Sequence, residues 1–235
     1  MSSYTTVMVL FILLSILAIP RIGKHGAPPL QPTQPAYGPE HALVYDIATF
    51  DYARAQHELA AMPPNVVDLG CGTGYHVGHL PDAVGVDLSP SMVRRAKALY
   101  PSAKFVEGDA TNRWLFPAES VPHISLLYYT VYYVEDKHLL FQNIKYWLRP
   151  GGLCLVHLSR KLNYGTKRLN HKCRVHADTM QEYFVLKRAH RYEHRFYFEP
   201  YAAVQAILEY CGFELVSCDA YPTDPDQDLL TLRKL

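Results

Sequence analysis

The sequence predicts an α/β protein with a doubly wound, mostly parallel sheet of seven strands. From about residue 65 onward, short apolar segments alternate with segments of helical period, which is typical of a parallel sheet covered by helices on both faces. A glycine-rich turn at residues 70–74 directly follows the first apolar segment, where open α/β sheets bind their ligands. The chain of 235 residues, 49% hydrophobic, suits one globular domain with accessory segments.

Three regions are expected along the chain: a hydrophobic segment at 1–20, a proline-rich linker at 21–40 and the globular domain at 41–235. The run from Tyr4 to Pro20 carries no charge and, as a helix, would be about 25 Å long, at the short end for crossing a bilayer. Arg21 and Lys24 follow this run, which favours an uncleaved single-pass membrane anchor with the domain facing the cytosol. A cleaved signal peptide and a buried N-terminal helix are the alternatives.

Five prolines between residues 26 and 40 are typical of an extended spacer rather than a core segment. In the domain, helices are expected at 42–62, 89–100, 136–148 and 201–213, with another beginning at 74–80. Ser89 and Pro90 supply a helix N-cap and a first-turn proline. Strands are expected at 65–69, 83–88, 103–109, 124–130, 153–158, 214–221 and 228–235.

Residues 160–200 interrupt the alternation and are expected to form an antiparallel insertion over one edge of the sheet, after the fifth strand. Between Arg160 and Arg195 there are ten Lys and Arg but three Asp and Glu, a net charge of +7 in a chain of net charge +1. This segment is expected to form part of a substrate site. Its Arg188, Arg191 and Arg195 would favour an anionic substrate or a membrane surface, and the alternative is a solvated face.

The cysteines argue against a disulfide framework and a zinc site. There are five, an odd number, and no two are spaced as a CxxC pair. A reducing compartment and a site without a metal are therefore expected.

The glycine turn does not fit a phosphate-binding loop. The pattern G-x-G-x-x-G would need glycine where Tyr75 or Val77 stands, and no G-x-x-x-x-G-K-[ST] is present. Asp68 adds a negative charge just before the turn, which favours a ligand that lacks phosphate and carries positive charge. Asp87 and Asp109 close the next two predicted strands, where one carboxylate can accept both hydroxyls of a ribose and the other an exocyclic amine.

Four segments together resemble the class I S-adenosylmethionine-dependent methyltransferases: "VVDLGCGTG", "VGVDLSPSM", "FVEGDA" and "LRPGG". The resemblance implies a Rossmann-like methyltransferase sheet and S-adenosyl-L-methionine as cofactor. Asp68 and the backbone of the glycine turn would hold the methionyl part, Asp87 the ribose diol, and Asp109 with Ala110 the adenine. The implied cofactor-binding residues are Asp68, Gly70, Cys71, Gly72, Gly74, Asp87, Leu88, Met92, Asp109, Ala110 and Tyr128. The fourth strand, "HISLLYYT", lacks the acid that often opens it in this family.

The resemblance also implies a methyltransferase reaction, in which the cofactor supplies the reactivity and the protein the orientation. If the acceptor must lose a proton, His157 at the end of the fifth strand is the first candidate for general base, and Tyr128 is the second. Four tyrosines lie at the end of the fourth strand and directly after it: Tyr128, Tyr129, Tyr132 and Tyr133. Each would stack on adenine, shape the acceptor site, bear a hydrogen bond or simply pack in the core.

A small molecule, a lipid or a protein side chain is the expected methyl acceptor. Nucleic acid is not expected, because no Asn-Pro-Pro-Tyr-like motif follows the fourth strand. The alternatives to an enzyme are a non-catalytic cofactor-binding protein and a membrane-tethered interaction module of the same fold. The sequence predicts no particular oligomeric state.

Overall fold

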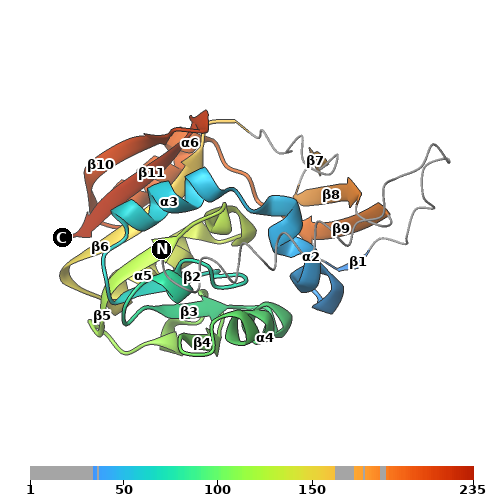
Figure 1. Cartoon of the computed structure of the whole chain (residues 1–235). Helices are drawn as coiled ribbons and strands as arrows, with labels where there is room; N and C mark the ends of the chain where they lie inside the picture. Colours follow the sequence, from blue (N-terminus) through green and yellow to red (C-terminus); the bar gives the residue numbers. More distant parts are fainter. Residues whose placement is uncertain (1–33, 36, 162–171, 177, 186–188) are drawn as a thin grey trace.

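The computed structural model describes residues 34–35, 37–161, 172–176, 178–185 and 189–235. Two sheets are present in these residues: a seven-stranded sheet in the order β10-β11-β6-β5-β2-β3-β4, and a four-stranded sheet in the order β1-β9-β8-β7. Helix α2 lies between them (Figure 1).

The large sheet contains five parallel strands: β2 (Val66–Leu69), β3 (Val84–Asp87), β4 (Lys104–Glu107), β5 (Val121–Leu126) and β6 (Leu148–Ser159). Strand β11 (Asp224–Lys234) pairs antiparallel with β6, and β10 (Phe213–Tyr221) pairs antiparallel with β11. The order reverses between β2 and β5, so the carboxyl end of β2 lies at the switch point where such sheets bind ligands. The predicted doubly wound, mostly parallel seven-stranded sheet is confirmed.

The helices in the described part of the chain are α2 (Pro39–Thr49), α3 (Tyr52–Ala61), α4 (Pro90–Leu99), α5 (Lys137–Trp147) and α6 (Tyr201–Tyr210), with short 3₁₀ turns η1 (Val77–His79), η2 (Arg113–Leu115) and η3 (Thr130–Tyr133). As predicted, the Ser89 side chain caps α4, accepting a hydrogen bond from the Met92 N–H at 3.2 Å. The main core is formed by β-strand residues such as Ile124 and Leu126 and by Phe141 and Trp147 of α5, all fully buried.

Two predicted helices differ from the structure. The single helix expected at 42–62 is divided into α2 and α3, because the Asp51 carboxylate accepts from the Arg54 N–H and caps a new helix. The helix expected from residues 74–80 is wrong, because only the turn η1 forms. Gly74 and Gly78 disfavour a helix here, and Pro81 follows directly.

The small sheet consists mainly of the insertion: β7 (Lys172–His176), β8 (Thr179–Val185) and β9 (Ala189–Arg195) are antiparallel neighbours. Rather than extending one edge of the large sheet, these strands form a separate sheet beside α2 (Figure 1). The His41 ring of α2 stacks on Tyr192 of β9, with ring centroids 4.0 Å apart.

Part of the expected linker belongs to this arrangement. Residues Gln34–Pro35 form β1, which pairs in parallel with β9, and α2 already begins at Pro39. The expected membrane anchor at 1–20 and the rest of the linker up to residue 33 lie outside the described residues. No helix in the described part of the chain is long and apolar enough to cross a membrane.

Candidate active site

A cavity of ≈ 630 Å³ opens at the carboxyl ends of β2, β3 and β4. Its floor comes from the glycine turn and from the loops that follow β3 and β4. Its cover comes from two segments far apart in sequence, Tyr37–Gly38 before α2 and residues 193–195 of β9. The predicted residues that line it are Gly70, Gly72, Asp87, Leu88, Met92, Asp109, Ala110 and Tyr128.

The three glycines of the turn all have left-handed backbone, at φ +73° for Gly70, +54° for Gly72 and +84° for Gly74. A β-carbon on Gly70 would lie 2.5 Å from Thr130 Oγ1, and one on Gly74 would lie 2.5 Å from the Phe105 ring. At Gly72 the nearest atom would be Tyr45 Cε1, 3.8 Å away, which is an ordinary van der Waals contact without a clash. Gly72 therefore lets a ligand approach bare backbone, whereas Gly74 serves packing and is not among the cavity residues.

Asp87 joins the glycine turn to the end of β3. Its Oδ2 accepts from the Gly72 N–H and its Oδ1 accepts from the Ser89 N–H, both at 2.8 Å. Burial raises the pKa of Asp87 above its ordinary value, and the two backbone hydrogen bonds oppose this shift. Each oxygen retains a lone pair, so the fixed carboxylate can still accept the two hydroxyls of a diol.

The loop after β4 supplies Asp109 and Ala110. Asp109 Oδ1 accepts from both the Thr111 N–H and the Thr111 hydroxyl, at 2.8 and 2.7 Å. Asn143 of α5 holds the loop from behind, donating through Nδ2 to the Ala110 carbonyl at 3.2 Å. Leu88 is 68% exposed and Met92 is buried, so this end of the cavity offers one open apolar side and one fixed carboxylate.

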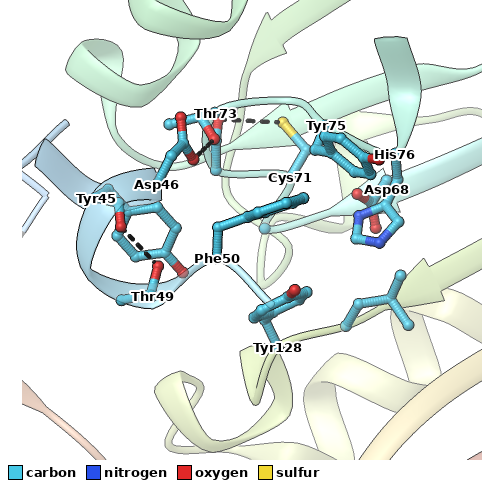
Figure 2. A pocket seen from close by; sticks show the side chains of 13 residues that line it. Tyr45, Asp46, Thr49, Phe50, Asp68, Cys71, Thr73, Tyr75, His76 and Tyr128 are labelled. Atoms are coloured by element: carbon cyan, nitrogen blue, oxygen red, sulfur yellow. Dashed lines mark hydrogen bonds between the residues drawn. The ribbon is translucent and has the colours of Figure 1, made fainter. Parts of the chain in front are cut away.

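A second cavity of ≈ 50 Å³ adjoins the first, because both are lined by Tyr45, Gly70, Gly72 and Tyr128. Figure 2 shows the side chains around it, which come from α2 and the loop after it, from the end of β2, from the glycine turn and the residues that follow it, and from the loop after β5. Asp68 and Cys71, both predicted from the sequence, lie here rather than in the large cavity. Asp46 and His76 were not predicted.

Asp68 is buried, and its Oδ1 accepts from the Ser125 hydroxyl at 2.7 Å. Burial raises the pKa of Asp68 to about 6, although the nearby His76 and the Ser125 hydrogen bond lower it. Burial lowers the pKa of His76, but its contact with Glu58 outweighs burial, and the net shift is upward. Glu58 Oε2 lies 2.9 Å from His76 Nε2, and Glu58 Oε1 accepts from the Tyr221 hydroxyl at 2.7 Å. The small cavity thus contains a buried carboxyl group, Asp68, and a buried imidazole, His76, which is held by Glu58.

The four tyrosines after β5 divide into two pairs. Tyr128 and Tyr133 line the large cavity. Tyr129 and Tyr132 are buried in the core, and the Tyr132 hydroxyl exchanges hydrogen bonds with the backbone of Ser159.

Tyr128 lies where a site residue is expected, but the pKa of its phenol does not suit a general base. Its φ of 47° is rare for a bulky side chain and is a strained conformation at the junction of the two cavities. Burial raises the pKa of Tyr128 well above its ordinary value, so the phenol keeps its proton. This pKa argues against Tyr128 as a general base, whereas its place beside a bound cofactor stays a prediction.

His157, the first predicted base, is fully buried and is not among the residues that line either cavity. Its Nδ1 accepts from the Tyr129 N–H at 3.0 Å, which leaves Nε2 to donate to Gln227 Oε1 at 3.1 Å. Burial lowers the pKa of His157 well below its ordinary value. Both nitrogens are engaged, so His157 holds the left-handed backbone of Tyr129 instead of contacting a substrate. The prediction of a catalytic role is corrected accordingly.

The insertion reaches the large cavity through Glu193, His194 and Arg195 of β9, and its part in a substrate site stays a prediction. The arginines are engaged within the insertion: Arg195 forms an ion pair with Asp178, and Arg191 donates to Gln181 at 3.1 Å. Arg188 lies outside the described residues. Tyr37 and His194 were not predicted, because only the folding of the linker end and of β9 over the cavity brings them there.

Known methyltransferases are similar to this chain in sequence and in fold. Residues 66–152 match the family model described as a methyltransferase domain. This segment of the chain therefore resembles a methyltransferase domain. The matched residues include the glycine turn, Asp87 and Asp109, and they end at the turn between α5 and the main part of β6.

Curated methyltransferases give shorter matches. The chain is 33% identical over 100 residues to phosphoethanolamine N-methyltransferase 1 of Triticum aestivum, covering 39% of this chain and 20% of that protein. It is 30% identical over 113 residues to trans-aconitate 2-methyltransferase of Methylobacterium radiotolerans, covering 46% and 42%. The chain thus spans less than half the length of these relatives.

Solved methyltransferase structures share the fold over most of the chain. The CcbJ methyltransferase of Streptomyces caelestis superposes with a TM-score of 0.64 at 17% identity, covering 85% of this chain and 98% of that one. The amino pentose methyltransferase CalS10 of Micromonospora echinaspora, bound to S-adenosylmethionine, superposes with a TM-score of 0.62 at 15% identity, covering 90% and 100%.

Proposed function

We propose that this protein is an S-adenosylmethionine-dependent methyltransferase that acts on a small molecule. The observation that carries the proposal is the Asp87 carboxylate, fixed by the N–H groups of Gly72 and Ser89 at the rim of the large cavity. A carboxylate held in this way at the end of the second strand is suited to a ribose diol. The match of residues 66–152 to a methyltransferase domain and the S-adenosylmethionine-bound structure of similar fold support the same cofactor.

The adjoining cavities suit the two ends of this cofactor. In the proposed arrangement, the adenosine lies in the large cavity between Asp87 and the Asp109–Ala110 loop. The zwitterionic methionyl end enters the small cavity, where Asp68 faces an ammonium group and His76 faces a carboxylate. The bound cofactor supplies an electrophilic methyl group, and the chain's own residues bind it, orient it and exclude water.

The acceptor would enter from the side covered by Tyr37 and β9. The relatives' names describe methyl transfer to phosphoethanolamine, trans-aconitate and an amino pentose, all small molecules. A cavity of ≈ 630 Å³ has room for a nucleoside and a small acceptor, which favours this class over a protein side chain or a lipid. A purely non-catalytic binding role is not favoured by these relatives.

Two measurements on the full-length chain test the proposal. Calorimetry is expected to detect binding of S-adenosylhomocysteine, and incubation with methyl-labelled S-adenosylmethionine and small-molecule acceptors is expected to yield a labelled product. Absence of cofactor binding by the folded chain would contradict the proposed function.

We also propose that residues 1–20 anchor the protein in a membrane as a single span, with the catalytic domain facing the cytosol. The support is the uncharged run at Tyr4 to Pro20 followed by Arg21 and Lys24.

A further inference from the structure

His194 is the polar side chain of the large cavity that the proposed cofactor site leaves unused. It lies on β9, with its ring centroid 5.4 Å from that of Tyr37 and 5.3 Å from that of Tyr133. Both ring nitrogens are buried, and neither has a hydrogen-bond partner among the residues that the structure describes. Buried polar atoms almost always have a partner, so an imidazole without one at a cavity wall indicates a place for a ligand.

The charged groups near His194 have partners of their own. Arg195 is ion-paired with Asp178, and Glu193 Oε2 accepts from Gln181 Nε2 at 3.0 Å. The other ionisable neighbours are Glu182 of β8 and the phenols of Tyr37 and Tyr133. The imidazole of His194 is therefore the group at this wall whose ring nitrogens are most available to a ligand.

Burial lowers the pKa of His194 to about 4, against the opposing effect of Glu182 and Glu193. At neutral pH the imidazole is uncharged, with one N–H and one lone pair. A base this weak does not take a proton from an ammonium ion. It does take one from a hydroxyl oxygen that is forming a bond to carbon, because that oxygen becomes strongly acidic as the bond forms.

We propose that His194 is the general base of the methyl transfer and that the acceptor is a neutral hydroxyl compound seated in the large cavity, at the wall formed by His194, Tyr37 and Tyr133. The inference rests on the proposed function. The acceptor oxygen uses a lone pair to form the bond to the methyl carbon. The bond from that carbon to sulfur breaks, and its electron pair stays on sulfur. The hydroxyl proton passes to the free nitrogen of His194 and then to solvent, so the products are the methyl ether and S-adenosylhomocysteine, whose sulfur is an uncharged thioether.

The first test compares acceptors of different chemistry. Phenol, catechol and benzyl alcohol supply neutral hydroxyl groups, phosphoethanolamine supplies an amine, and trans-aconitate supplies carboxylates that have no proton to lose. Full-length protein with labelled S-adenosylmethionine is expected to methylate at least one hydroxyl probe. Cofactor binding with transfer only to phosphoethanolamine or trans-aconitate, or with no transfer to any hydroxyl probe, would overturn the inference and leave the cofactor site standing.

The second test removes the base. His194→Gln keeps a hydrogen-bonding side chain but has no basic nitrogen, and it is expected to lower kcat by about 100-fold with the affinity for S-adenosylhomocysteine unchanged. His138→Gln is the matched control, because His138 is exposed at the start of α5 and lines neither cavity. Equal kcat in the His194 variant and the wild type would overturn the inference.

A third measurement does not depend on turnover. In protein carrying ¹⁵N-labelled histidine and saturated with S-adenosylhomocysteine, catechol is expected to shift the ring nitrogen signals of His194 and leave those of His138 in place. Signals of His194 that do not respond to catechol would count against the proposed contact.

Discussion

The Asp87 carboxylate and the Gly72 backbone N–H are joined by a hydrogen bond of 2.8 Å across the carboxyl ends of β2 and β3. This bond connects two motifs that are fifteen residues apart in the sequence. It fixes the left-handed turn and the carboxylate together, so that the surface for a sugar is formed before any ligand arrives. Preorganisation of this kind reduces the entropic cost of binding.

The glycines of the turn are expected to respond differently to the same substitution. Gly72→Ala brings its methyl group into ordinary contact with Tyr45 at the cavity, without a clash, so it should cost only about 1–2 kcal/mol of stability for the left-handed backbone and should strongly weaken cofactor binding. Gly74→Ala drives the methyl group into Phe105, so it should cost more stability. Denaturant unfolding and calorimetry measure both effects, and a larger loss of stability in the Gly72 variant would contradict the assignment.

Cofactor affinity is expected to fall as the pH drops below about 6. Burial raises the pKa of Asp68 to about 6, so the carboxylate becomes neutral in this range and no longer attracts an ammonium group. Above this pH the carboxylate is ionised and the attraction is fully present. Titrations with S-adenosylhomocysteine from pH 5 to pH 8 measure the effect. The Asp68→Asn variant should bind the cofactor weakly, and its affinity should no longer fall between pH 6 and pH 5. An unchanged pH dependence in that variant would exclude Asp68 as the group responsible.

His157→Gln separates a structural role from a catalytic one. Loss of the contacts to the Tyr129 N–H and to Gln227 should lower the free energy of unfolding by about 1–3 kcal/mol. The pH dependence of kcat should stay as in the wild type, because His157 lines neither cavity. A variant of normal stability that loses an ionisation from its pH–rate profile would restore His157 as the base.

The sequence was most informative about the large sheet. Its strands follow apolar runs, and its glycine turn and Asp87 lie at strand ends, so local patterns predict both the elements and their shared edge. Helix 74–80 was wrong because packing of Gly74 against Phe105 and of Gly78 against Tyr100 favours a tight turn over helical backbone.

The cover of the site was much harder to predict. Tyr37 lies in a proline-rich run and His194 in a mixed segment, and neither segment has a periodicity that marks its position. They meet because Ser89 donates to the Tyr37 carbonyl at 2.7 Å and because His41 stacks between Tyr37 and Tyr192. His157 was misjudged for a related reason: a position at the end of a strand does not reveal that both ring nitrogens already have partners.

The N-terminal anchor gives a separate prediction. The full-length protein should fractionate with membranes and resist carbonate extraction, whereas a chain that lacks residues 1–25 should be found in the soluble fraction. The reason is the uncharged run from Tyr4 to Pro20. A secreted product with its mature N-terminus near Gly26 would overturn both the anchor and the topology.

The central claim, that the cavity beside Asp87 holds the ribose of S-adenosylmethionine, is tested most directly by calorimetric titration of Asp87→Ala with S-adenosylhomocysteine. Glu107→Gln is the matched control, because Glu107 pairs with Asp87 in the sheet but is exposed and lines neither cavity. Asp87→Ala, verified as folded by circular dichroism, is expected to lose about 1–3 kcal/mol of binding free energy, while the Glu107 variant is expected to bind like the wild type. Wild-type affinity in the folded Asp87 variant would show that Asp87 does not hold the ribose.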